Sequence, residues 1–92
     1  MSRVSGTSTL RNALANQIRR ERAKRELSQE ELAWLSDLHR TYISLVERGK
    51  RSLTVDSLER ISITLGMSPS ILLKHAENRR RQVTRNGGKT TA

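Results

Sequence analysis

Helix start and stop signals recur along this chain at intervals that leave room only for short helices. Ser28-Gln29-Glu30-Glu31 is a capping box, in which the Ser28 hydroxyl and the Glu31 carboxylate each bind a backbone N–H group of the first turn. Thr54 and the Ser68-Pro69 pair are further helix starts, and Gly49 and Gly66 are helix stops. Apolar and polar residues alternate nowhere in a sustained way, so no strand is expected. These signals predict an all-α fold of five short helices.

Apolar residues repeat every three or four positions between these signals, as they do on the buried side of a helix. The expected helices run from about Thr9 to Arg25, from Ser28 to Asp37, from about Arg40 to Arg48, from Thr54 to Gly66, and from Ser68 into the C-terminal residues, where the helix is expected to fray. The apolar residues expected on their inner sides are Leu10, Leu14, Ile18, Ala23, Leu32, Ala33, Leu35, Ile43, Val46, Leu58, Ile61 and Leu65. Four arginines of the first helix are expected on its exposed side: Arg11, Arg19, Arg20 and Arg22.

The chain is strongly basic, with 18 Lys and Arg residues against nine Asp and Glu residues and a net charge of +9. Much of the excess lies in Arg79–Ala92, which has five basic residues, no acidic residue and a Gly87-Gly88 pair. We therefore expect a flexible arm over Met1–Thr9, a folded domain over residues 10–78 and a flexible basic tail over residues 79–92. A charge of this sign and size favours a polyanionic partner, above all nucleic acid.

Several classes of protein are disfavoured by what the sequence does not contain. The chain has no cysteine, which excludes disulfides, thiolate catalysis and Cys-based metal sites. His39 and His75 stand far apart and the acidic residues are scattered among basic ones, so we expect no metal, no cofactor and no enzyme active site. The longest apolar run, Ile71–Leu73, has three residues, and no secretory signal opens the sequence. We therefore expect a cytoplasmic protein with no membrane partner, and no small-molecule ligand is indicated.

The second and third expected helices are short and are joined by a three-residue turn that begins at Asp37. Ala33 is small where two helices would cross closely, and Ile43 and Val46 are spaced to pack beneath it. This is the arrangement of a helix-turn-helix, whose second helix enters the major groove of DNA.

At this point a family resemblance becomes specific. Leu27–Arg51 resembles the helix-turn-helix of the lambdoid phage repressors and Cro proteins, and Thr54–Ala76 resembles the fourth and fifth helices of that family. Within the family, His39–Ser44 and Glu47–Arg51 most resemble the controller proteins of restriction–modification operons. The resemblance covers about Leu10–Ala76. It implies a sequence-specific transcriptional regulator that binds double-stranded operator DNA as a homodimer.

The resemblance also implies roles for residues around the third helix. Side chains at the start of this helix would read base edges, and these are His39, Arg40, Thr41 and Ser44. Arg40 is the main candidate, because a guanidinium can pair with O6 and N7 of guanine. The residues expected to contact phosphates or the DNA backbone are Gln29, Tyr42, Arg48, Lys50 and Arg51. Tyr42 could instead lie at the edge of the core, and Glu47 could form an ion pair with Arg40 or Arg51.

Three positions depart from the family pattern. Asp37 stands in the turn where relatives often have Gly, so the turn is expected to be slightly strained, and Leu45 replaces a polar base-reading residue of some relatives. Ile63 is apolar where the family is usually polar, and it joins Ile71, Leu72 and Leu73 in an apolar face larger than one small core needs. We expect this face to form a two-fold dimer that matches a palindromic operator. The alternative is that it only closes the core of a single chain.

A different kind of function also fits this fold. An antitoxin or adaptor would act mainly through a protein partner, and Trp34 or the basic tail would supply its contact surface. Trp34 could equally cover the outside of the first helix. Single-stranded nucleic acid is a less suitable partner, because such proteins stack bases on aromatic side chains and this chain has only Trp34 and Tyr42.

Overall fold

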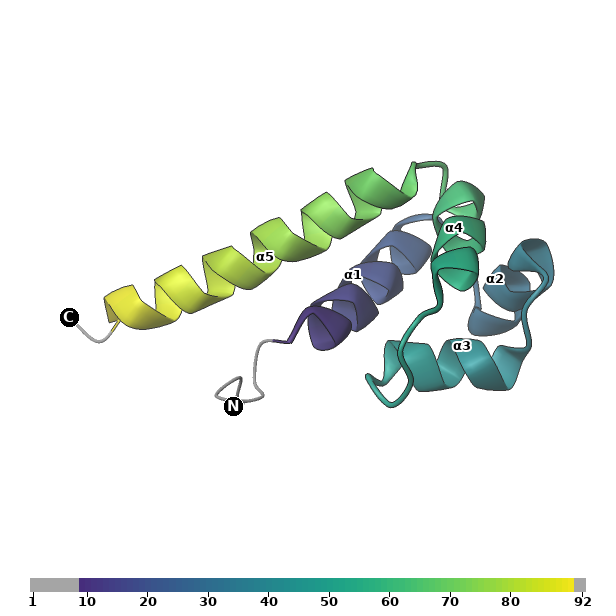
Figure 1. Ribbon diagram of the computed structural model, residues 1–92, viewed down its shortest axis with the longest axis horizontal. Helices are drawn as coiled ribbons and strands as arrows, with labels where there is room; N and C mark the ends of the chain where they lie inside the picture. Colours follow the sequence, from purple (N-terminus) through teal and green to yellow (C-terminus); the bar gives the residue numbers. More distant parts are fainter. Residues whose placement is uncertain (1–8, 91–92) are drawn as a thin grey trace.

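Five helices follow one another along the chain, and the residues that the structure describes contain no strand. The structure is a computed structural model that describes residues 9–90, and the side chains of residues 9–80. The helices are α1 (Leu10–Lys24), α2 (Gln29–Ser36), α3 (Arg40–Glu47), α4 (Val55–Thr64) and α5 (Pro69–Thr90). Helix α5 lies alongside α1 and extends past its beginning, while α2, α3 and α4 gather at the other end of the molecule (Figure 1). The predicted all-α, five-helix fold is confirmed.

Helices α2 and α4 begin at residues whose side chains satisfy free backbone N–H groups. Ser28 and Glu31 form the predicted capping box: the Glu31 N–H donates to Ser28 Oγ at 2.9 Å, and the Ser28 N–H donates to Glu31 Oε1 at 2.8 Å. Thr54 accepts from the Ser57 N–H at 3.0 Å and starts α4. These caps make the helix starts predictable, because each depends on residues within three positions of one another.

Left-handed residues end several of the helices. Gly49 and Gly66 have φ angles of 71° and 80°, which glycine adopts without steric cost, so both predicted stops are confirmed. Asp37 closes α2 with a φ angle of 59°, and Arg60 Nη1 of α4 donates to its carbonyl at 3.2 Å. Glu26 is also left-handed, with a φ angle of 55°, at the exit from α1. Nothing in the sequence marked Glu26, since Gly or Asn is the usual residue at such a position.

The core lies where α1, α2, α3 and α4 meet the first turns of α5. Its buried apolar members are Ile18, Leu32, Ala33, Ile43, Val46, Ile61, Leu65 and Leu72. Seven of these are among the expected inner residues, whereas three other expected inner residues, Leu10, Ala23 and Leu35, are exposed. Leu35 is 55% exposed because α2 turns Leu32, Ala33 and Ser36 inward and leaves Leu35 on its flank. Ala23 is exposed because it lies on the opposite side of α1 from Ile18.

Helix α5 crosses the expected boundary between domain and tail at residues 78 and 79 without interruption. Its backbone is helical to Thr90, so it includes most of the basic C-terminal residues (Figure 1). Apart from Thr9, the expected N-terminal arm lies outside the described residues. None of the described helices is both long enough and apolar enough to cross a membrane.

Candidate nucleic-acid interface

The start of α3 presents a row of polar side chains on the surface. His39, Arg40 and Thr41 are exposed, and Ser44 one turn later is half-buried. His39 occupies the N-cap position of α3, but its side chain makes no capping hydrogen bond. Its imidazole therefore does not cap the backbone N–H groups at the start of α3. The structure places all four residues predicted to read bases between the N-cap and the middle of one short helix.

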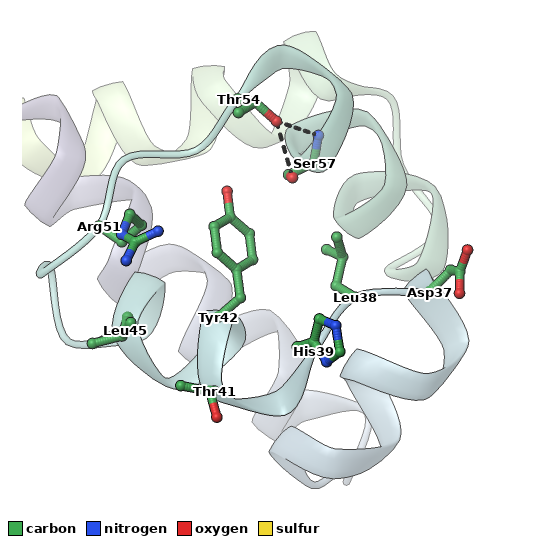
Figure 2. A pocket seen from close by; sticks show the side chains of 9 residues that line it. All are labelled: Asp37, Leu38, His39, Thr41, Tyr42, Leu45, Arg51, Thr54 and Ser57. Atoms are coloured by element: carbon green, nitrogen blue, oxygen red, sulfur yellow. Dashed lines mark hydrogen bonds between the residues drawn. The ribbon is translucent and has the colours of Figure 1, made fainter.

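An open cavity of about 470 Å³ lies between the start of α3, the loop after it and the start of α4. Figure 2 shows Tyr42 pointing from α3 towards Thr54, with Arg51 beside it, while the side chain of Thr41 points away from that of Tyr42. The cavity thus brings together residues predicted to read bases and residues predicted to bind phosphates. The lining residues are Asp37, Leu38, His39, Thr41, Tyr42, Leu45, Arg51, Thr54 and Ser57.

Tyr42 connects α3 to the loop that follows it. Its ring is half-buried and packs against the core, and its hydroxyl donates to the Ser52 carbonyl at 3.3 Å. Within this chain, Tyr42 therefore lies at the edge of the core, as the alternative stated. Its contact with a phosphate remains a prediction. The hydroxyl has a single hydrogen, so a phosphate oxygen would have to replace the Ser52 carbonyl as its acceptor.

Three basic side chains follow the end of α3. Arg48, Lys50 and Arg51 are all exposed, and Arg48 Nε makes a long hydrogen bond of 3.4 Å to the Ser44 carbonyl. Gly49 separates them and lets the chain turn back towards α4. The three cations thus lie at the C-terminal end of α3, opposite the end that presents Arg40.

Gln29, the first residue of α2, lies beside the end of α3 and is half-buried. Its Nε2 donates to Glu47 Oε1 at 3.0 Å. Glu47 is 1% exposed, and its carboxylate accepts two hydrogen bonds from Arg22 of α1, from Nε at 2.7 Å and from Nη2 at 2.8 Å. The expected ion pair of Glu47 with Arg40 or Arg51 is wrong, because the Glu47 carboxylate faces the interior and pairs there with Arg22 of α1.

Arg22 joins three parts of the chain. Its remaining nitrogen, Nη1, donates to the Leu27 carbonyl at 2.8 Å in the loop before α2. The hydrogen bonds to Glu47 raise the pKa of Arg22 above its ordinary value, although burial acts to lower it. Arg22 is therefore not on the exposed side of α1 as expected, since its guanidinium is held over the end of α3.

Sequence reasoning missed this buried pair, although a signal for it was present. Glu47 follows Ile43 by four positions, and Arg22 follows Ile18 by four. Each charged residue therefore shares a helix face with a core isoleucine. A charge on a buried face needs an opposite charge as partner, and this pattern could have paired the two.

The apolar residues predicted to form a dimer are not alike. Ile63 at the end of α4 is 63% exposed, and Ile71 at the start of α5 is 40% exposed. Leu73 is half-buried. Leu72 is fully buried, so its assignment to a dimer interface is wrong: it points from α5 into the core and closes the chain's own interior.

Trp34 is the largest exposed apolar side chain of α2. It is 80% exposed, so it does not cover the outside of α1. It lines a hollow on the outer side of α2 together with Ser28, Glu30, Glu31 and Leu35.

The acidic and histidine side chains among the described residues form no group suited to hold a metal ion.

Comparison with known proteins identifies the class of protein to which this geometry belongs. A helix-turn-helix family model matches residues 18–72, more than half of the chain. The chain therefore belongs to the helix-turn-helix family of DNA-binding transcriptional regulators.

Within that family the chain is similar to control proteins. It is 46% identical over 68 residues to the control protein C.BamHI of Bacillus amyloliquefaciens, covering 73% of this chain and 84% of that protein. The restriction-modification controller protein C.Esp1396I, solved as a tetramer with its natural 35 base-pair operator, shares 35% identity at a TM-score of 0.73, covering 80% of this chain and 97% of that chain. The clp gene regulator ClgR from Corynebacterium glutamicum shares 26% identity at a TM-score of 0.82, covering 90% and 88%.

Proposed function

We propose that this protein is a controller-type regulator that binds a palindromic operator in double-stranded DNA, with α3 in the major groove. The observation that carries the proposal is the exposed row His39, Arg40 and Thr41 at the start of α3. At the C-terminal end of α3, Gln29 of α2 lies beside Glu47, and the basic loop follows the helix. Exposed polar side chains on a short helix with backbone-binding groups around it suit direct readout of bases.

The binding form that we propose is a homodimer. Ile63 and Ile71 leave apolar surface exposed at the junction of α4 and α5, and a two-fold axis would bury this surface against its copy. Two copies of α3 would then meet two half-sites related by the same symmetry. The controller C.Esp1396I forms a tetramer on its operator, which supports an oligomeric form here. Such a regulator works beside the DNA that it reads, so we place it in the cytoplasm.

We further propose that the basic C-terminal segment, residues 79–92, adds affinity without sequence preference. The segment contains five cationic residues and no acidic residue. Cationic side chains bind phosphates by releasing counterions, which strengthens binding to any DNA sequence.

The test is selection of bound duplexes from a random DNA pool, using the wild type and two variants. The wild type should recover one palindromic motif. Arg40→Ala should lose the preference at one base pair of each half-site, because a bidentate contact to guanine contributes about 1–3 kcal/mol of discrimination. Arg51→Ala, which removes an equal charge, should weaken binding to all sequences evenly and keep the motif.

Two results would contradict the proposal. One is the absence of any enriched motif with the wild type. The other is an equal and sequence-independent loss in Arg40→Ala and Arg51→Ala, which would assign both arginines to the backbone.

A further inference from the structure

The side-chain amide of Gln29 is held by a buried carboxylate rather than left free at the surface. Gln29 Nε2 lies 3.0 Å from Glu47 Oε1, although the two residues belong to different helices, α2 and α3. An ionised carboxylate can only accept hydrogen bonds, so the nitrogen of the Gln29 amide, and not its oxygen, must face Glu47. The contact therefore determines which way the amide is turned.

This orientation leaves one donor available. A glutamine Nε2 carries two N–H groups, and Glu47 takes one of them. A phosphate oxygen is also an acceptor, so it can use the second N–H but could not use the amide oxygen. A Gln29 side chain turned the other way would present an acceptor to the phosphate and repel it.

Glu47 is itself held rigidly. Its side chain is 1% exposed and its carboxylate is bound by Arg22 Nε and Nη2 at 2.7 and 2.8 Å. Arg19 Nη1 donates to the Glu47 backbone carbonyl at 2.7 Å. Two arginines of α1 thus fix the acid against which the Gln29 amide is oriented.

We propose that Glu47 is a positioning residue for DNA binding: it holds the Gln29 amide with one N–H turned outward to donate to a DNA phosphate. This inference rests on the proposed function, because the phosphate belongs to the operator. Glu47 touches no DNA in this arrangement. It acts through Gln29, and it also couples the start of α2 to the end of α3.

The first experiment uses the free protein and needs no DNA. Side-chain ¹⁵N relaxation reports how rigidly each amide NH₂ group is held. In the wild type, the Gln29 amide should be more ordered than the amide of exposed Asn78. Gln17 is the matched control, because its Nε2 donates to a second buried carboxylate, Glu21 Oε2, at 2.8 Å.

The variant that isolates Glu47 is the double substitution Arg22→Met/Glu47→Leu. It removes one positive and one negative charge, so the net charge of the chain is unchanged. Replacing a buried ion pair by apolar residues of similar size often preserves stability. Thermal unfolding checks that the double variant is folded, and its Gln29 amide should become as mobile as that of Asn78 while Gln17 stays ordered.

The second experiment measures affinity for the selected palindromic duplex in a double-mutant cycle. Gln29→Ala should weaken binding of the wild type about tenfold, the effect of one charge-assisted hydrogen bond. In the Arg22→Met/Glu47→Leu background the same substitution should weaken binding less than about threefold, because the free amide is no longer oriented.

The outcomes separate the two proposals. An equal factor for Gln29→Ala in both backgrounds, or a wild-type Gln29 amide as mobile as Asn78, would overturn the positioning role and leave the regulator proposal intact. The second of these results remains decisive if the double variant does not fold. Failure of the wild type to select any duplex, with an ordered Gln29 amide, would contradict the regulator proposal, and with it the role proposed for Glu47.

Discussion

Glu26 and Asp37 have the same left-handed backbone but differ in what supports it. The short side chain of Asp tolerates this conformation, and Arg60 binds the Asp37 carbonyl from α4. Glu26 has a longer side chain. Backbone bonds of the same kind close both turns: the Glu26 N–H donates to the Ala23 carbonyl at 3.0 Å and the Leu27 N–H to the Arg22 carbonyl at 3.1 Å, as the Asp37 N–H donates to the Trp34 carbonyl at 3.2 Å and the Leu38 N–H to the Ala33 carbonyl at 2.9 Å. This is a helix end that suits glycine.

We predict that Glu26→Gly stabilises the protein. Glycine adopts a positive φ without steric strain, and after the entropy of the unfolded chain is included the gain should be about 0.5–1 kcal/mol. The free energy of unfolding in urea measures it. Glu26→Ala is the control, because it removes the same charge but keeps a Cβ atom. An equal gain in Glu26→Ala would show that charge, and not backbone strain, is responsible.

Glu21 is a buried carboxylate with several cationic neighbours. Burial acts to raise the pKa of Glu21, but hydrogen bonds from Arg25 and Gln17 and the charges of Lys24 and Arg25 outweigh it, so the pKa lies below its ordinary value. The distances are 2.8 Å from Arg25 Nη1 to Glu21 Oε1 and 2.8 Å from Gln17 Nε2 to Oε2. His75 Nδ1 of α5 lies 3.7 Å from Oε2.

This lowered pKa predicts a loss of stability in acid. The unfolded chain protonates Glu21 first, at about pH 4.3, so the stabilisation is present at neutral pH and is lost as the pH falls from about 5 through the folded-state pKa. Unfolding free energies measured between pH 7 and pH 3 should fall more steeply for the wild type than for Glu21→Gln. Parallel slopes for the two proteins would assign the acid sensitivity to other carboxylates.

At the scale of elements, α5 has two different apolar sides. Leu72 points into the core and is fully buried, whereas Ile71 beside it is 40% exposed. A helix places neighbouring residues about 100° apart, so adjacent apolar residues face different surroundings. One side stabilises the single chain and the other is available to a second copy.

Two substitutions should separate these sides. Leu72→Ala should lower the free energy of unfolding by about 2–5 kcal/mol, the cost of a cavity in a packed core. Ile63→Lys should leave the fold of the single chain nearly unchanged but dissociate the proposed dimer, as measured by sedimentation at micromolar concentration. A wild type that sediments only as a 10.5 kDa species would contradict the dimer. A small effect of Leu72→Ala would contradict the assignment of Leu72 to the core.

At the scale of the whole molecule, the chain has a net charge of +9, and two groups of its basic residues differ in how they are arranged. Arg40 and the basic loop after α3 are placed by the fold at defined ends of one helix. The C-terminal basic residues instead follow one another along the last part of α5. In the function that we propose, the placed residues would read sequence, whereas the accumulated C-terminal charge would add affinity and salt sensitivity.

This division predicts a separable salt dependence. Substituting Gln for Arg79, Arg81, Arg85 and Lys89 keeps good helix-forming residues and leaves Arg80, which pairs with Glu77 at 3.7 Å. The slope of log affinity against log salt should become shallower by about 0.9 for each DNA phosphate that the variant no longer neutralises. The selected DNA motif should remain the same. An unchanged slope would show that the C-terminal residues do not bind DNA.

The starts of α2, α4 and α5, the helix ends at Asp37, Gly49 and Gly66, the fold class and the row of polar residues at the start of α3 could be predicted from the sequence. Each depends on neighbours a few positions apart: Glu31 caps its own helix with Ser28, and Gly49 ends α3 by its own backbone freedom. The burial of Leu72, the exposure of Leu35 and the pairing of Glu47 with Arg22 depend instead on how the helices pack. Arg22 and Glu47 lie 25 positions apart and meet at 2.7 Å only after α1 and α3 have packed together. Capping hydrogen bonds join residues a few positions apart, so short stretches of sequence predict them. The partner of a buried charge depends instead on which helices the core brings together.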